Sequence, residues 1–239
     1  MLSLKHLAIV AGALPVGALA TAAVAYDAGS VSDGGAVSGK VTYNGPVPTK
    51  KVIPTKDANV CGSIRDVKLV AVGAGNGVQD AIVFLKEVAS GKDWGEPESV
   101  PEIDNVKCEF DPHVQVIRSG EIDVVNTDPV LHNTHGFYGR RTAFNLALPN
   151  QGQRIKVELT RPGLVRVECD AHGWMLGWIY IADSPYYALT GEDGSFSLAE
   201  VPPGDYTLVT WQEHTDATEM PVTVKAGETA EVAIELKKQ

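Results

Sequence analysis

The feature that most constrains the fold is a series of short segments of alternating polarity, separated by turn signals, that begins near residue 37. Apolar and polar residues alternate in 37–43 and in 155–159, and each segment is followed by a turn signal, at 44–46 and at 161–163. No segment shows a convincing amphipathic helical pattern. The chain is therefore predicted to be all-β, built from antiparallel strands in a sandwich or barrel.

The N-terminal segment has the pattern of a secretory signal. Lys5 precedes an apolar run over 7–22, and Ala23-Val24-Ala25 is typical of a cleavage site. We expect residues 1–25 to be a signal peptide of the general secretory route, which predicts a periplasmic or extracellular protein. The alternative is an uncleaved anchor, which would be the chain's one contact with a membrane. Residues 26–36 are rich in Gly, Ser and Asp and are expected to be a flexible leader.

Charge and cysteine content narrow the function classes. Acidic residues outnumber basic ones by 30 to 20, a formal net charge of −10, which argues against a nucleic-acid partner. An exported chain can form disulfides, yet it has three cysteines, so one of them has another role.

The strongest chemical signal is Cys169-x2-His172-x2-Met175 between two predicted strands. Thiolate and imidazole could hold zinc, but a thioether is a soft ligand that zinc disfavours. Two imidazoles, one thiolate and a weak axial Met are the ligands of a blue-copper electron-transfer site. The second imidazole would come from His132 or His135, which lie three residues apart and would face opposite sides of an extended strand.

With these motifs, the segment 104–183 resembles the cupredoxins, closest to the amicyanin, pseudoazurin and plastocyanin group. The matching stretches are 124–133, which ends in His132-Asn133, the approach to it at 110–112 and 120–121, and the loop spacing of 169–175. The resemblance implies a Greek-key sandwich that holds one type 1 copper ion. It implies that His132, Cys169 and His172 are the equatorial ligands and that Met175 is the axial ligand.

Further roles follow from the same resemblance. Asn133 would tie the two ligand loops together and donate its backbone N–H to the thiolate sulfur. The family often has proline after the loop histidine, whereas this chain has Gly173. The electron would leave through an exposed edge of His172, surrounded by a rim of Pro129, Leu131, Gly173 and Trp174.

The other two cysteines, Cys61 and Cys108, are predicted to form a disulfide in the oxidising compartment. The alternative is two buried thiols. In the chain-entropy model, a disulfide that closes so long a loop contributes about 4 kcal/mol of stability.

The C-terminal segment 184–239 resembles the carboxypeptidase regulatory-like, or transthyretin-like, β-sandwich module. The resemblance rests on three features: D-G-x-F-x-L at 193–198, V-P-P-G-x-Y at 201–206, and Trp211. The N-terminal β segment 37–103 is expected to complete one of the two sandwiches. Whether the second module is tandem or interleaved stays open at this stage.

The predicted ligand set leaves no open coordination position for a substrate, so we expect a single-electron carrier and no enzyme. The acidic surface would steer a basic partner such as a c-type cytochrome, or serve a respiratory or dehydrogenase complex. Two alternatives stay open: a copper storage or delivery protein, and a β-sandwich interaction module without redox activity. A multicopper enzyme would need further copper-binding histidines, usually as H-x-H pairs. The sequence contains no H-x-H pair.

Overall fold

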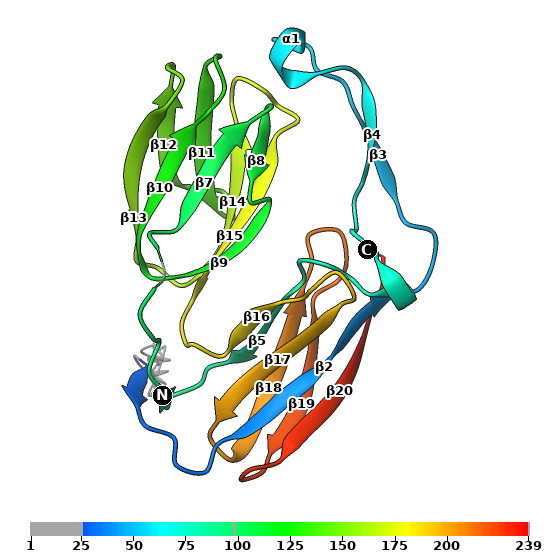
Figure 1. The fold of residues 1–239 in the computed structure, drawn as a ribbon, viewed down its shortest axis with the longest axis vertical. Helices are drawn as coiled ribbons and strands as arrows, with labels where there is room; N and C mark the ends of the chain where they lie inside the picture. The colour runs from blue at the N-terminus through cyan, green and yellow to red at the C-terminus, as the bar shows by residue number, and fades with distance from the viewer. Residues whose placement is uncertain (1–25, 98, 239) are drawn as a thin grey trace, which may run out of the picture.

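The computed structural model describes residues 26–97 and 99–238, so the predicted signal peptide 1–25 lies outside the described residues. The predicted all-β class is confirmed. Two β-sandwiches lie one beyond the other, and a two-stranded arm rises from one of them alongside the other (Figure 1). Among the described residues, no helix is long and apolar enough to cross a membrane.

The first sandwich spans residues 102–182 and has one sheet of four strands and one of five. The four-stranded sheet runs in the order β13 (Gln153–Leu159), β10 (Gly120–Asn126), β7 (Glu102–Val106) and β8 (Glu109–Asp111). The five-stranded sheet runs β12 (Arg141–Leu148), β11 (His132–Tyr138), β14 (Gly163–Cys169), β15 (Leu176–Ala182) and β9 (Val114–Arg118). Alternation within the strands places apolar side chains such as Ile122, Val165 and Ile179 between the sheets.

The second sandwich takes strands from both ends of the chain. Its three-stranded sheet runs in the order β17 (Ser195–Val201), β2 (Gly35–Tyr43) and β20 (Thr229–Leu236). Its four-stranded sheet runs in the order β16 (Tyr187–Leu189), β5 (Ile82–Lys86), β18 (Gly204–Trp211) and β19 (Thr218–Val224). β2 pairs in parallel with β20, and β5 lies between β16 and β18. The second sandwich is therefore interleaved: the first sandwich is inserted between β5 and β16. The segment 37–103, predicted as one unit, is divided between the two sandwiches. It contributes β2 and β5 to the second sandwich, and its last residues begin β7 of the first sandwich at Glu102.

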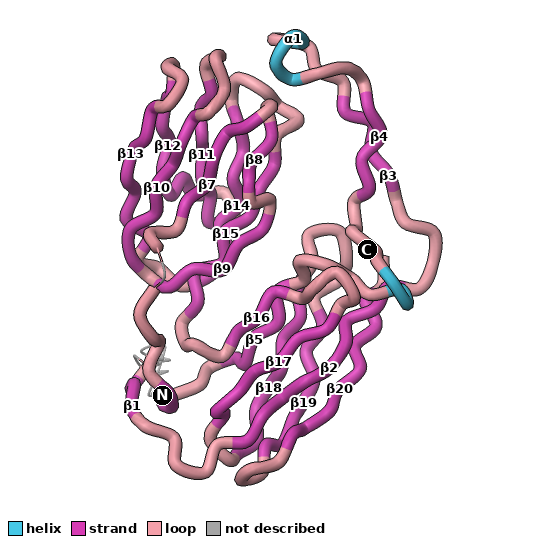
Figure 2. The backbone as a smooth tube through the Cα atoms, viewed as in Figure 1, coloured by secondary structure: helices cyan, strands magenta, loops and turns pink. Residues whose placement is uncertain are grey.

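Smaller elements complete the described chain (Figure 2). In place of the expected flexible leader at 26–36, β1 (Asp27–Gly29) pairs in parallel with β6 (Ser90–Lys92), and β2 already begins at Gly35. A 3-10 turn, η1, covers Ala74–Asn76. The arm, residues 49–68, consists of the hairpin β3 (Thr49–Val52) and β4 (Arg65–Lys68) with the short helix α1 (Ala58–Cys61) at its tip.

The two sandwiches meet through a compact joint. Tyr180 packs on Phe84 with ring centroids 4.7 Å apart, and Trp178 packs on Trp211 at 5.0 Å. The buried Glu213 accepts hydrogen bonds from the Trp178 indole and, at 2.6 Å, from His113. These contacts join side chains from both sandwiches and fix one relative to the other.

Candidate metal centre

The ligand loops meet because two neighbouring antiparallel strands end at the same place. β14 ends at Cys169 and β11 begins at His132, with Thr134 opposite Cys169 in the register. After Cys169 the chain makes two tight turns, in which the amide of His172 donates to the Cys169 carbonyl and the amide of Met175 to the His172 carbonyl. The x2 spacings of the motif thus repeat one turn geometry, which keeps Cys169, His172 and Met175 in one compact loop.

Three donor atoms converge in a buried space. Cys169 Sγ lies 3.7 Å from Nδ1 of both His132 and His172, and the two Nδ1 atoms are 3.1 Å apart. Both imidazoles have no exposed surface, and Cys169 is 2% exposed. A point equidistant from atoms at the corners of this triangle lies about 2.0 Å from each, which is a metal–nitrogen bond length and only slightly short for a metal–sulfur bond.

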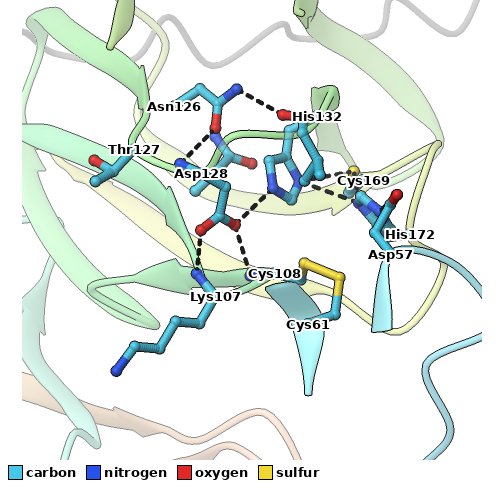
Figure 3. A network of polar contacts seen from close by, with 12 residues as sticks. Asp57, Cys61, Lys107, Cys108, Asn126, Thr127, Asp128, His132, Cys169 and His172 are labelled. Atoms are coloured by element: carbon cyan, nitrogen blue, oxygen red, sulfur yellow. Dashed lines mark hydrogen bonds and ion pairs between the residues drawn. A yellow bond between two sulfur atoms is a disulfide. The ribbon is translucent and has the colours of Figure 1, made fainter. Parts of the chain in front are cut away.

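Asp128 orients His132 from behind (Figure 3). Its Oδ2 lies 2.8 Å from His132 Nε2, and the same carboxylate accepts the backbone N–H groups of Lys107 at 2.7 Å and Cys108 at 2.8 Å. Lys107 and Cys108 both have positive φ angles and form the two-residue turn between β7 and β8. One buried carboxylate therefore stabilises this turn and sets the orientation of the His132 imidazole.

Asp57, from the arm, holds the other imidazole in the same way. Its Oδ2 lies 3.0 Å from His172 Nε2, although the two residues are 115 positions apart in the chain. The backbone carbonyl of Asp57 accepts the N–H groups of Val60 and Cys61 at 2.8 Å each, which forms the turn at the tip of the arm.

The predicted disulfide between Cys61 and Cys108 is present, and it attaches the tip of the arm to the first sandwich. Its two sulfurs and a ring nitrogen of His172 lie within 4.8 Å of one another. Arg65 adds to the attachment by donating to the Cys61 carbonyl and pairing with Glu109. Asp57 is thus held over the centre by a covalent link and by an ion pair.

The two carboxylates determine which nitrogen faces the centre. A proton on each Nε2, directed at its carboxylate, leaves the lone pair of each Nδ1 facing the centre. Burial, with a contribution from His172, lowers the pKa of His132 despite the opposing effect of Asp128, which favours the neutral ring. Two lone pairs and a sulfur therefore face one another in a space closed to water. This arrangement is stable with a cation between them and unfavourable without one.

The remaining predicted residues lie around this cluster. The Asn133 amide N–H points to Cys169 Sγ at 3.4 Å, and its side chain donates to Asn145. Met175 is 3% exposed and belongs to the same buried cluster as Cys169. Trp174 packs against the His172 ring, with centroids 5.1 Å apart.

His135, the other candidate for the first ligand, points away from Cys169. Its Nδ1 lies 3.2 Å from Asp170, its Nε2 lies 2.9 Å from the Thr142 hydroxyl, and its ring stacks on Phe137. The three-residue offset from His132 places it on the opposite face of β11, as the strand geometry predicts. The structure thus brings His132, and not His135, to the thiol.

One expectation about the site is wrong. His172 was expected to expose an edge to solvent, but it is completely buried, with Asp57 of the arm bonded to its Nε2 and Trp174 packed against its ring. Of the predicted rim, Pro129, Leu131 and Gly173 are exposed and Trp174 is half-buried. The exposed rim residues therefore do not surround an open imidazole.

Sequence reasoning missed both carboxylates. Asp128 lies four residues before His132, inside the motif that identified this histidine, so that spacing could have revealed it. Asp57 carries no such signal, because only the path of the arm brings it to the site.

A comparison with protein families matches residues 174–232 to the model described as polysaccharide lyase family 4, domain II. Among curated proteins, the chain is 43% identical over 54 residues to a probable rhamnogalacturonate lyase A of Aspergillus flavus. The match covers 23% of this chain and 10% of that protein. These matches support a β-sandwich module in the C-terminal part and name a different family from the carboxypeptidase regulatory-like one that its motifs resemble.

Solved structures similar to parts of the chain are cupredoxins and a copper enzyme. A purple cupredoxin from Nitrosopumilus maritimus is 22% identical, with 34% of this chain and 99% of that chain covered and a TM-score of 0.31. A reduced amicyanin variant is 15% identical, with 42% of this chain and 98% of that chain covered and a TM-score of 0.32. A copper-containing nitrite reductase from Thermus scotoductus is 17% identical, with 59% of this chain and 28% of that chain covered and a TM-score of 0.32. At these TM-scores the likenesses carry no weight for function, which depends on the geometry of the site.

The comparisons also correct one prediction from the sequence. The chain was expected not to be an enzyme, because the ligand set leaves no position for a substrate. The lyase family match and the lyase relative point instead to a possible enzyme. The ligand set concerns the metal centre alone and has no bearing on the second sandwich.

Proposed function

We propose that this chain is an exported copper protein whose first sandwich passes single electrons between redox partners. His132, Cys169 and His172 would hold the ion, and Met175 would supply a thioether as a further ligand. The observation that carries the proposal is the convergence of two Nδ1 atoms and one Sγ, while both Nε2 atoms are bonded to carboxylates.

The donor set favours copper over the commoner alternatives. A single thiolate with two imidazoles and a neighbouring thioether suits a soft or borderline ion, whereas structural zinc sites favour further thiolate or imidazole ligands. Bound copper supplies a one-electron couple between its +1 and +2 states. The periplasm or cell exterior stays part of the proposal, with c-type cytochromes or a respiratory or dehydrogenase complex as candidate partners.

The chain's own residues provide rigidity and exclude water. Asp128 and Asp57 prevent both rings from rotating, and the Asn133 amide stabilises negative charge on the sulfur. Asn126, which has no exposed surface, fixes the loop before His132 by donating to the carbonyls of Val130 and Leu148. A ligand cage fixed in this way needs little rearrangement when the charge at its centre changes, which is the requirement for rapid electron exchange.

The direct test is to load the full chain with Cu(II) and record its visible spectrum. We expect an intense thiolate-to-copper charge-transfer band that is absent in Cys169→Ala. His132→Ala should abolish the band, and His135→Ala should retain it, since His135 faces away from the thiol. A colourless protein that binds zinc in preference to copper would contradict the proposal.

A second candidate function concerns the second sandwich. The family match and the curated relative favour a role related to polysaccharide lyases. Incubating the full chain with rhamnogalacturonan, and measuring both retention on the polymer and new unsaturated ends, tests this candidate. Absence of both would remove it without affecting the copper proposal.

A further inference from the structure

The route from the metal centre to the surface passes through the arm. His172 is completely buried, so a partner protein cannot contact its imidazole directly. Asp57, bonded to His172 Nε2, has a side chain that is 40% exposed. The hydrogen bond between them is therefore a short connection from the ligand cluster to solvent, and the tip of the arm is the surface above it.

The arm has a charge opposite to that of the whole chain. Residues 49–68 contain Lys50, Lys51, Lys56, Arg65 and Lys68. Against these five cationic residues stand only Asp57 and Asp66, whereas the chain as a whole has a net charge of −10. The arm as a whole is therefore basic.

Ion pairing leaves part of this charge free. Lys51 pairs with Asp66 and Arg65 with Glu109, so among the acidic residues of the arm only Asp57, which is hydrogen-bonded to His172, has no Lys or Arg partner. Within the described part of the chain, Lys50, Lys56 and Lys68 are exposed and have no acidic partner. Their charge is available to a partner, and Lys56 lies directly beside Asp57 in the sequence.

The tip of the arm also exposes apolar side chains. Ile53 is 51% exposed and Ile64 is 59% exposed, and they lie where the chain enters and leaves the tip. Few other large apolar side chains among the described residues are so exposed. An apolar contact beside cationic residues is the composition expected of a transient protein–protein interface.

We infer that the arm, residues 49–68, is the docking surface for an acidic one-electron redox protein. This inference rests on the proposed electron-transfer function and identifies its partner by charge. It reverses the expectation of a basic partner, which came from the net charge of the chain. At physiological ionic strength charges are screened beyond about 8 Å, so a partner seated on the arm is influenced mainly by the arm.

The test compares two heme proteins of opposite charge, the acidic cytochrome b5 and the basic mitochondrial cytochrome c. Association with the full chain, both metal-free and copper-loaded, is measured by calorimetry over a series of salt concentrations. We expect cytochrome b5 to bind more tightly than cytochrome c, with an affinity that falls as salt rises. Lys56→Glu should weaken its binding about three- to tenfold, because reversing a charge at the edge of an interface mainly slows association.

Matched controls separate a local effect from a change in net charge or surface polarity. Lys225→Glu makes the same change in charge on the second sandwich, and we expect less than a twofold effect. Ile64→Ser should weaken binding of cytochrome b5, whereas Leu189→Ser, at another exposed apolar position, should not.

Two kinds of failure can be told apart. If the copper-loaded chain lacks the charge-transfer band, the proposed function fails whatever the arm binds. If the band is present but cytochrome b5 does not bind, or cytochrome c binds more tightly, or Lys56→Glu and Lys225→Glu behave alike, the docking inference is overturned.

Discussion

Replacing Asp57 by alanine should weaken copper binding, although Asp57 is not a metal ligand. The substitution leaves the N–H of His172 Nε2 without its acceptor in a side chain that has no exposed surface. A hydrogen bond to a charged group is worth about 1.5–3 kcal/mol. Because the Asp57 side chain is 40% exposed, water can enter in its place, so we expect about 1.5 kcal/mol, or roughly tenfold in affinity. Asp57→Asn retains an oxygen acceptor and should lose less.

The assay is competition for Cu(II) with a chelator, followed at the charge-transfer band, together with urea unfolding of the metal-free protein. Asp66→Ala is the control, since it removes a carboxylate from the same arm that pairs with Lys51 and does not contact His172. An affinity of Asp57→Ala within twofold of that of Asp66→Ala would refute the reasoning. Equal losses for Asp57→Ala and Asp57→Asn would show that charge, and not the acceptor, is what matters.

Three further predictions concern stability. Replacing Cys61 and Cys108 together by serine opens a link across 47 residues and should lower the free energy of unfolding by about 4 kcal/mol in urea titrations; a loss below about 1 kcal/mol would contradict this. At the joint, burial disfavours the charged forms of His113 and Glu213. The hydrogen bond and the attraction between the two side chains outweigh burial, so the pKa of His113 is raised and that of Glu213 is lowered. The His113 contribution is complete below its ordinary value of 6.5 and is lost as pH rises through the raised pKa, whereas the Glu213 contribution is complete above 4.5 and is lost as pH falls through the lowered pKa. Stability should therefore be highest between these two values, and Glu213→Gln should flatten the pH profile of the melting temperature; an unchanged profile would argue against the pair. Gly39→Ala places a Cβ 2.2 Å from the Val232 carbonyl oxygen on β20 and should destabilise the second sandwich by about 1–3 kcal/mol; the copper band should survive, and its loss would argue against separate cores.

The parts of the structure that the sequence predicts well depend on local pattern. Alternation in 155–159 and the turn at 161–163 are sufficient to predict β13 and its end, because the period of a strand and the chemistry of a turn are properties of adjacent residues. The spacing from Cys169 to Met175 likewise predicts a compact loop, and two short turns form it.

What the sequence does not predict depends on contacts between distant segments. Asp57 and His172 are 115 residues apart, and no local signal relates them. The pairing of β2 with β20 similarly joins the two ends of the described chain. Asp57 from the arm adds to the burial of His172, and no signal in the ligand loop indicates this contact.

The arm extends from the second sandwich and completes the metal centre of the first. This connection limits how the two sandwiches can be separated or recombined. A segment excised at 102–182 would carry His132, Cys169, His172 and Met175, but it would leave Asp57 and Cys61 behind. Cys108 would then be a free thiol, and the His172 Nε2 would lose its carboxylate partner. Recombination at the apparent borders of the sandwich would therefore transfer the ligands without their cover, so the two sandwiches should be exchanged between genes only together.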